Sequence, residues 1–136
     1  MDLQLHTLSS NGTTIIAVAG EVELHSAAQL RAELLQACDK ERPCIVIDLS
    51  GVNFMDSSGI GVIVGALKRA RERGGTLSLV GPQPRVRRIF EITGLLSALP
   101  FFETVDDAVT ACAANTSEVT AQDDQDSPEA NGRPNP

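Results

Sequence analysis

The chain has no tryptophan and no tyrosine, and only four of its 136 residues are phenylalanine. Its hydrophobic fraction of 42% is nevertheless that of a globular protein. The core is therefore expected to consist of aliphatic side chains. A chain of this length is expected to form one domain whose core needs neither a disulfide nor a metal to hold it together.

Long apolar runs are missing as well. No segment approaches the roughly 20 apolar residues that cross a bilayer. The N-terminal residues, M-D-L-Q-L-H-T-L, have neither the basic region nor the apolar run of a signal peptide. We therefore expect a soluble, cytoplasmic protein that makes no contact with a membrane.

Cysteines are few, and their arrangement carries no motif. Cys38, Cys44 and Cys112 are odd in number and lie far apart in the sequence. They fit neither the ligand spacing of a metal site nor a disulfide framework. We expect three small, buried thiols in a reducing compartment.

Positive charge is also scarce, and the net charge is −7. Residues 113–136 carry five acids and one arginine, which gives −4, and the preceding part carries 13 acids and 10 bases, which gives −3. A negative field disfavours nucleic acid as a direct partner. Because the final residues are polar and nearly free of large apolar groups, we expect a folded domain over 1–113 and a disordered acidic tail over 114–136.

Strand-like and helix-like apolar patterns alternate along the folded part. Strands are predicted at residues 3–8, 13–19, 44–49, 76–80 and 99–104, and helices at about 26–40, 59–73, 84–93 and 106–113. A turn signal at Ser10, Asn11 and Gly12 joins the first two strands into a hairpin. Since later strands alternate with helices, the pattern predicts an α/β fold with a small mixed, mainly parallel sheet.

The most informative segment lies between the strand at 44–49 and the next helix, where Asp56, Ser57 and Ser58 stand together. In such folds, sites are usually built at the carboxyl ends of strands. Ser58 is either an N-cap that stabilises the helix by about 1 kcal/mol or a hydroxyl that is modified or contacts a ligand. Ser57 has the same two interpretations. Asp56 either complements the helix dipole or accepts a hydrogen bond that orients a serine hydroxyl.

No catalytic constellation accompanies these hydroxyls. The G-x-S-x-G elbow of serine hydrolases is absent. Only His6 and His25 could act as a base, and His25 lies in a loop that could reach the same edge of the sheet. We expect a protein that is not an enzyme and that needs no metal or cofactor.

Two acids and two glycines flank the serines. Glu21 and Glu23 follow the second strand, and they are more simply a solvated loop than a catalytic pair, since such pairs normally come from separate elements. Gly59 and Gly61 lack the further glycines and the lysine of a phosphate loop. They are expected to give backbone freedom and to let a bulky partner reach the Ser58 hydroxyl.

Taken together, these motifs resemble the STAS domain of the bacterial anti-sigma factor antagonists, or anti-anti-sigma factors. The matching motifs are G-E-V-E at 20–23, I-V-I-D-L at 45–49, F-M-D-S-S-G-I-G-V-I at 54–63, the double glycine at 74–75 and R-R-I-F-E-I-T-G-L at 87–95. Their order and spacing agree over residues 3–112. The resemblance implies a sheet with helices packed chiefly on one face.

The resemblance also implies a phosphorylation switch with two partners. Unphosphorylated family members bind an anti-sigma factor, which is also a serine kinase, and so release a sigma factor for transcription. Phosphate on the second serine, which is Ser58 here, ends the complex, and a metal-dependent PP2C-type phosphatase restores the hydroxyl. The partner surface is then expected to comprise Glu21, Glu23, His25, Asp56, Ser57, Ser58, Gly59 and Gly61.

One departure from the family pattern concerns the loop after the second strand. Many members have G-E-L-D there, whereas this chain has G-E-V-E, so Glu23 stands where aspartate is common. The alternative to a switch is a STAS module that serves as a scaffold or binds a small ligand or nucleotide beside Ser58. The free-standing chain and its intact serine pair favour the switch.

Overall fold

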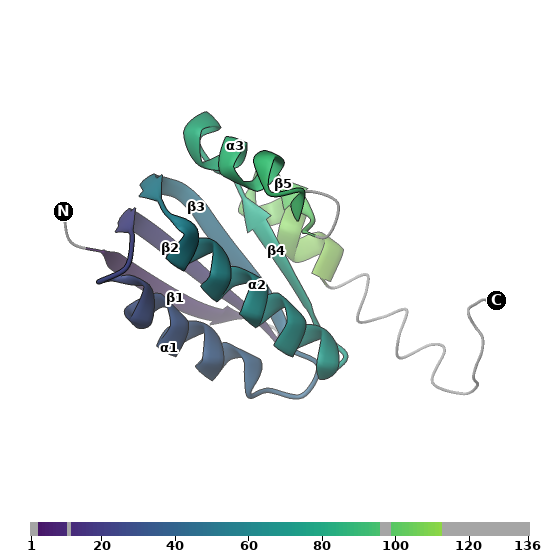
Figure 1. The fold of residues 1–136 in the computed structure, drawn as a ribbon. Helices are drawn as coiled ribbons and strands as arrows, with labels where there is room; N and C mark the ends of the chain where they lie inside the picture. Colours follow the sequence, from purple (N-terminus) through teal and green to yellow (C-terminus); the bar gives the residue numbers. More distant parts are fainter. Residues whose placement is uncertain (1–2, 11, 96–98, 113–136) are drawn as a thin grey trace.

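The structure, a computed structural model, describes residues 3–10, 12–95 and 99–112 (Figure 1). Its elements are β1 (Gln4–Ser10), β2 (Thr13–Val22), α1 (Ala27–Cys38), β3 (Cys44–Met55), α2 (Ser57–Glu72), β4 (Thr76–Val80), α3 (Pro84–Ile92) and β5 (Phe101–Phe102). A last helix, called the C-terminal helix below, covers residues 105–112.

The five strands form one sheet in the order β1-β2-β3-β4-β5. β1 runs antiparallel to β2, and each of the other neighbouring pairs is parallel. This is the small mixed, mainly parallel sheet that the alternation of strands and helices predicts, so the predicted fold class is confirmed. The carboxyl ends of β2 and β3 therefore lie side by side at one edge of the sheet.

The core lies on both faces of the sheet because β3 is apolar at nearly every position of its first half. Ile45, Ile47 and Leu49 face the larger cluster, to which α1, α2 and α3 contribute. Cys44 and Val46 face a smaller cluster with the C-terminal helix. Figure 1 shows α1 and α2 side by side across one face and the C-terminal helix behind β4. The helices thus cover chiefly, but not solely, one face.

Two strands run further than predicted, to Val22 and to Met55. Glycines within them hid this extension. Gly20 has φ +106° and lies where the pairing of β2 with β3 shifts register, as in a bulge. A Cβ on Gly51 would lie 3.0 Å from the Cβ of Ala19, so glycine allows the two strands to pair closely. The predicted strand at 99–104, by contrast, shortens to Phe101–Phe102.

One prediction about the cysteines is wrong. Cys44 and Cys112 form a disulfide, with their Cα atoms 6.0 Å apart and a separation of 68 positions in the sequence. The first residue of β3 and the last turn of the C-terminal helix meet on the same face of the sheet, and sequence spacing does not reveal that meeting. Cys38 is free and buried, as expected, and burial raises the pKa of its thiol.

No helix in the described ranges is long and apolar enough to cross a membrane. The predicted acidic tail at 114–136 lies outside the described residues.

Candidate functional site

Asp56 begins α2. Its backbone is extended, with φ −106° and ψ −172°, and its Oδ1 accepts hydrogen bonds from the N–H of Ser58 at 2.8 Å and of Gly59 at 3.4 Å. These bonds satisfy N–H groups that the first turn of a helix leaves unpaired. The N-cap is therefore Asp56 and not Ser58, and the helix begins two residues earlier than predicted. The carboxylate binds the Ser58 backbone, not the hydroxyl.

Neither of the two serine hydroxyls caps α2. Ser57 is exposed and Ser58 is half-buried in the first turn of α2. Within the described part of the chain, neither hydroxyl takes part in a hydrogen bond. Both lie at a helix N-terminus, where the dipole favours a negative group.

The two glycines differ in what surrounds them. Gly59 is buried, and a Cβ there would lie 2.7 Å from Cγ1 of Val22 and 2.8 Å from Cγ of Met55. Its lack of a side chain lets the first turn of α2 pack closely on the ends of β2 and β3. Gly61 is exposed, and a Cβ there would meet nothing within 4 Å. Of the two, only Gly61 presents open space to a partner.

The loop after β2 is held by a reciprocal pair of hydrogen bonds. The N–H of Ser26 donates to Oε1 of Glu23 at 2.9 Å, and the N–H of Glu23 donates to Oγ of Ser26 at 3.0 Å. The Ser26 hydroxyl also donates to the carbonyl of Glu21 at 2.8 Å. Ser26 occupies the N-cap position of α1, as predicted, but its side chain makes no capping bond to the helix.

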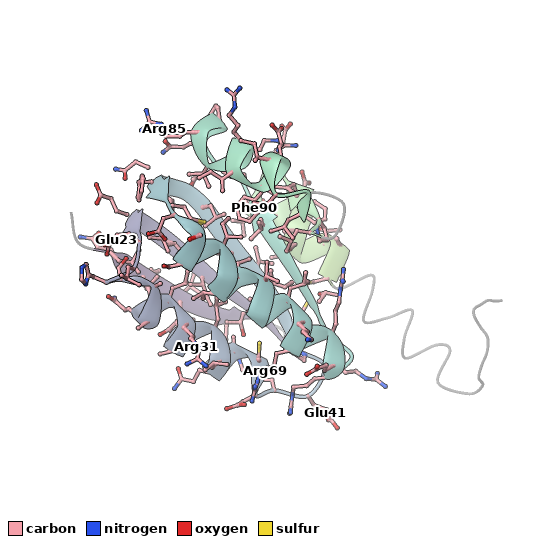
Figure 2. The ribbon with its side chains drawn as sticks, in the orientation of Figure 1. Glu23, Arg31, Glu41, Arg69, Arg85 and Phe90 are labelled. Carbon is pink, nitrogen blue, oxygen red and sulfur yellow. A yellow bond between two sulfur atoms is a disulfide. The ribbon has the colours of Figure 1, made fainter. Side chains whose placement is uncertain are left out.

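Strand pairing brings this loop against the serines. Glu21 pairs with Phe54 and Val22 with Met55, and the N–H of Asp56 donates to the carbonyl of Val22 at 3.1 Å. Glu21 and Glu23 therefore lie beside the turn that carries Asp56, Ser57 and Ser58, and the exposed His25 follows in the same loop. Figure 2 shows Glu23 at this end of the molecule, with Arg69 at the opposite end.

Two exposed apolar residues at the same edge were not among the predicted site residues. Leu24 is 70% exposed and Phe54 is 43% exposed. Large side chains of this kind on a surface often mark a protein contact. Leu24 could have been noticed in the sequence, since it interrupts an otherwise polar loop. Phe54 could not, because its exposure depends on which face of β3 it occupies.

Nothing in this arrangement provides a metal site. The described residues contain no group of three or more His, Cys, Asp or Glu side chains that could hold an ion. His6 lies on β1, which β2 separates from β3 and the serines. The geometry offers an exposed edge with acids, hydroxyls and apolar side chains, suited to contact with another protein.

Comparison with known proteins decides the family. The family model of the STAS domain matches residues 4–108. The chain belongs to the STAS domain family. This confirms the resemblance that the motifs carry. An anti-sigma F factor antagonist from Paenibacillus polymyxa is 32% identical over 112 residues, which are 81% of this chain and 95% of that protein.

Solved structures of antagonists share the fold of this STAS domain. An anti-sigma factor antagonist from Mycobacterium paratuberculosis is 28% identical, with a TM-score of 0.75 over 82% of this chain and 95% of that one. The Bacillus cell fate determinant SpoIIAA in its phosphorylated form is 27% identical, with a TM-score of 0.63 over 80% of this chain and 97% of that one.

Proposed function

We propose that this STAS protein is an anti-sigma factor antagonist that binds an anti-sigma factor through the edge at the ends of β2 and β3. The partner surface comprises Glu21, Glu23, His25, Asp56, Ser57, Ser58, Gly59 and Gly61, to which we add Leu24 and Phe54. Gly59 contributes by packing inward and so setting the position of the serines, while the other residues are partly or fully exposed. The protein acts by binding and not by catalysis.

The observation that best supports the proposal is that Asp56, and not Ser58, caps α2. The Asp56 carboxylate caps α2, so the Ser58 hydroxyl can be modified without loss of the cap. We infer that the anti-sigma factor is also the serine kinase. The Ser58 oxygen attacks the γ-phosphorus of ATP and forms a new P–O bond. The bond between the γ-phosphorus and the β,γ-bridging oxygen breaks, so ADP leaves, and the hydroxyl proton passes to a base on the kinase. A PP2C-type phosphatase reverses the modification by hydrolysis.

Phosphate at Ser58 is expected to act on the interface and not on the fold. It adds a charge of about −1.5 to −2, which a helix N-terminus tolerates. In the complex the same charge is buried against a surface that fits a bare hydroxyl, and Asp56 and Glu23 lie near it with the same sign. Each loss of about 1.4 kcal/mol weakens binding tenfold.

Support comes from two sides. Relatives with this fold are named anti-sigma factor antagonists, and one similar structure is of a phosphorylated antagonist. Glu23, which stands where aspartate is common in the family, accepts a hydrogen bond from the Ser26 N–H at 2.9 Å. This position therefore keeps a carboxylate, and the carboxylate also holds the loop.

The test is transfer of phosphate. The purified protein is incubated with each ATP-binding anti-sigma factor of the same cell and with ATP, and its intact mass is followed. We expect an increase of about 80 Da, the mass of one phosphoryl group, on Ser58. Ser58→Ala should abolish the increase, and Ser57→Ala is the matched control that should retain it. Phosphate found on Ser57 alone would move the modified position to Ser57. No phosphate with any anti-sigma factor would favour a scaffold or ligand-binding module without a switch.

A further inference from the structure

A hollow lies beneath the C-terminal helix, on the face of the sheet opposite to α1 and α2. Its volume is about 300 Å³, and its walls include Ser78 of β4, Phe102 of β5, and Ala108 and Ala111 of the C-terminal helix. Where the same helix meets β3 and the end of β4, the side chains of Cys44, Val46 and Val80 fill the space against it. Towards β5 the facing side chains are small, and the space stays open.

Ser78 is the unusual member of this lining. It is only 5% exposed, and its hydroxyl has no hydrogen-bond partner among the described residues. A buried polar group without a partner destabilises the fold, because its hydrogen bonds to water are lost and not replaced. The hydroxyl of the neighbouring Thr76, by contrast, lies 3.5 Å from Sγ of Cys44 and 3.6 Å from Sγ of Cys112.

Ser78 is well placed to serve a ligand. Ser78 lines the hollow, and its hydroxyl has no partner that a ligand would have to displace. A single water would be held poorly there, since buried waters need two to four polar partners and the walls are mainly aliphatic and aromatic. An apolar molecule with one polar group would form a hydrogen bond with the Ser78 hydroxyl, and its apolar part would cover the apolar walls of the hollow.

Charge narrows the class of ligand further. No residue that lines the hollow is charged, so a buried anion or cation would be left without a partner, which is costly. The acids Glu103, Asp106 and Asp107 in the adjoining segment further disfavour an anion.

We propose that this hollow binds an uncharged small molecule with an apolar body and one hydroxyl or carbonyl group that pairs with Ser78. Its volume is at the lower end for ligand pockets, which suggests a body of about six to ten non-hydrogen atoms. The body would pack between Phe102 and the two alanines of the C-terminal helix. Because the hollow lies on the face away from α2, this proposal is independent of the phosphorylation switch.

The test uses the full chain, labelled with ¹⁵N, titrated with cyclohexanol and followed by amide spectra. We expect saturable shifts centred on Ser78, Phe102, Ala108 and Ala111, with a dissociation constant in the millimolar range or below. Ser78→Ala should weaken binding about three- to tenfold through the loss of one hydrogen bond. Its unfolding temperature should be equal to or above that of the parent, because an unpaired hydroxyl is removed.

Two controls keep the result specific. Ala111→Leu places a larger side chain at the wall and should abolish the saturable shifts. Cyclohexanecarboxylate has a similar body with a negative charge and should not bind. The proposal is overturned if cyclohexanol gives no saturable shifts, if Ala111→Leu binds it as the parent does, if Ser78→Ala binds it with equal strength, or if the carboxylate binds as tightly as the alcohol.

Discussion

At the scale of single residues, the site depends on which of Asp56, Ser57 and Ser58 caps α2. Asp56 caps α2 through its bond to the Ser58 N–H at 2.8 Å, so the Ser58 hydroxyl is not needed for the cap. Sequence alone did not settle which residue caps the helix, because aspartate and serine are about equally good N-caps. The backbone decides it, since Asp56 is the residue with the extended conformation between β3 and α2.

Asp56→Ala is expected to lower the free energy of unfolding by about 1 kcal/mol, because it removes the acceptor of the first-turn N–H groups. Asp56→Asn is the matched control. It keeps a side-chain oxygen at the cap and should remain within a few tenths of a kcal/mol of the parent. Urea unfolding followed by circular dichroism measures both. If the alanine and asparagine variants lose the same stability, the cap described here is not what holds the start of α2.

At the scale of elements, α2 carries glycines of two kinds. Gly59 lies against Val22 and Met55, whereas Gly65 is exposed and a Cβ there would meet nothing within 4 Å. The sequence shows Gly59, Gly61 and Gly65 as equivalent members of one helix. Only the packing of α2 on β2 and β3 separates them.

Gly65→Ala is expected to raise the free energy of unfolding by about 0.5–1 kcal/mol, because alanine loses less backbone entropy in a helix. Gly59→Ala, the same chemical change, should instead lower it by about 1–3 kcal/mol, because its Cβ overlaps Val22 and Met55. Chemical denaturation of both variants measures the change in the free energy of unfolding, which should be positive for Gly65→Ala and negative for Gly59→Ala. Equal effects of the two changes would contradict the packing of the first turn of α2.

The elements also show how far sequence patterns reach. Periodicity placed each helix and strand of the described part in the right order, and the motif at 54–63 located the candidate site. Periodicity predicted the end of β3 at Leu49, because Ser50 and Gly51 resemble a turn in the sequence. The strand instead continues to Met55 through pairing with β2. Periodicity missed the disulfide because Cys44 and Cys112 meet only once the C-terminal helix folds over the sheet.

At the scale of the whole molecule, the two proposed sites lie in different places. The ends of β2 and β3 present Glu21, Glu23 and Asp56 with the two serines at one edge. Arg69 lies at the opposite end (Figure 2), and the disulfide and the hollow lie on the far face. The phosphate that we propose at Ser58 would therefore add charge to an edge that is already acidic, away from the face that holds the disulfide and the hollow.

The most direct measurement compares the affinities of Ser58→Ala and Ser58→Asp for the cognate anti-sigma factor, with amide spectra of both free variants. We predict that Ser58→Ala binds within a few-fold of the parent and that Ser58→Asp binds at least tenfold more weakly, a loss of about 1.4 kcal/mol. The spectral changes should stay confined to residues around the start of α2. Equal affinities, or a weakened Ser58→Asp whose spectrum changes throughout the domain, would contradict a switch that acts at the interface.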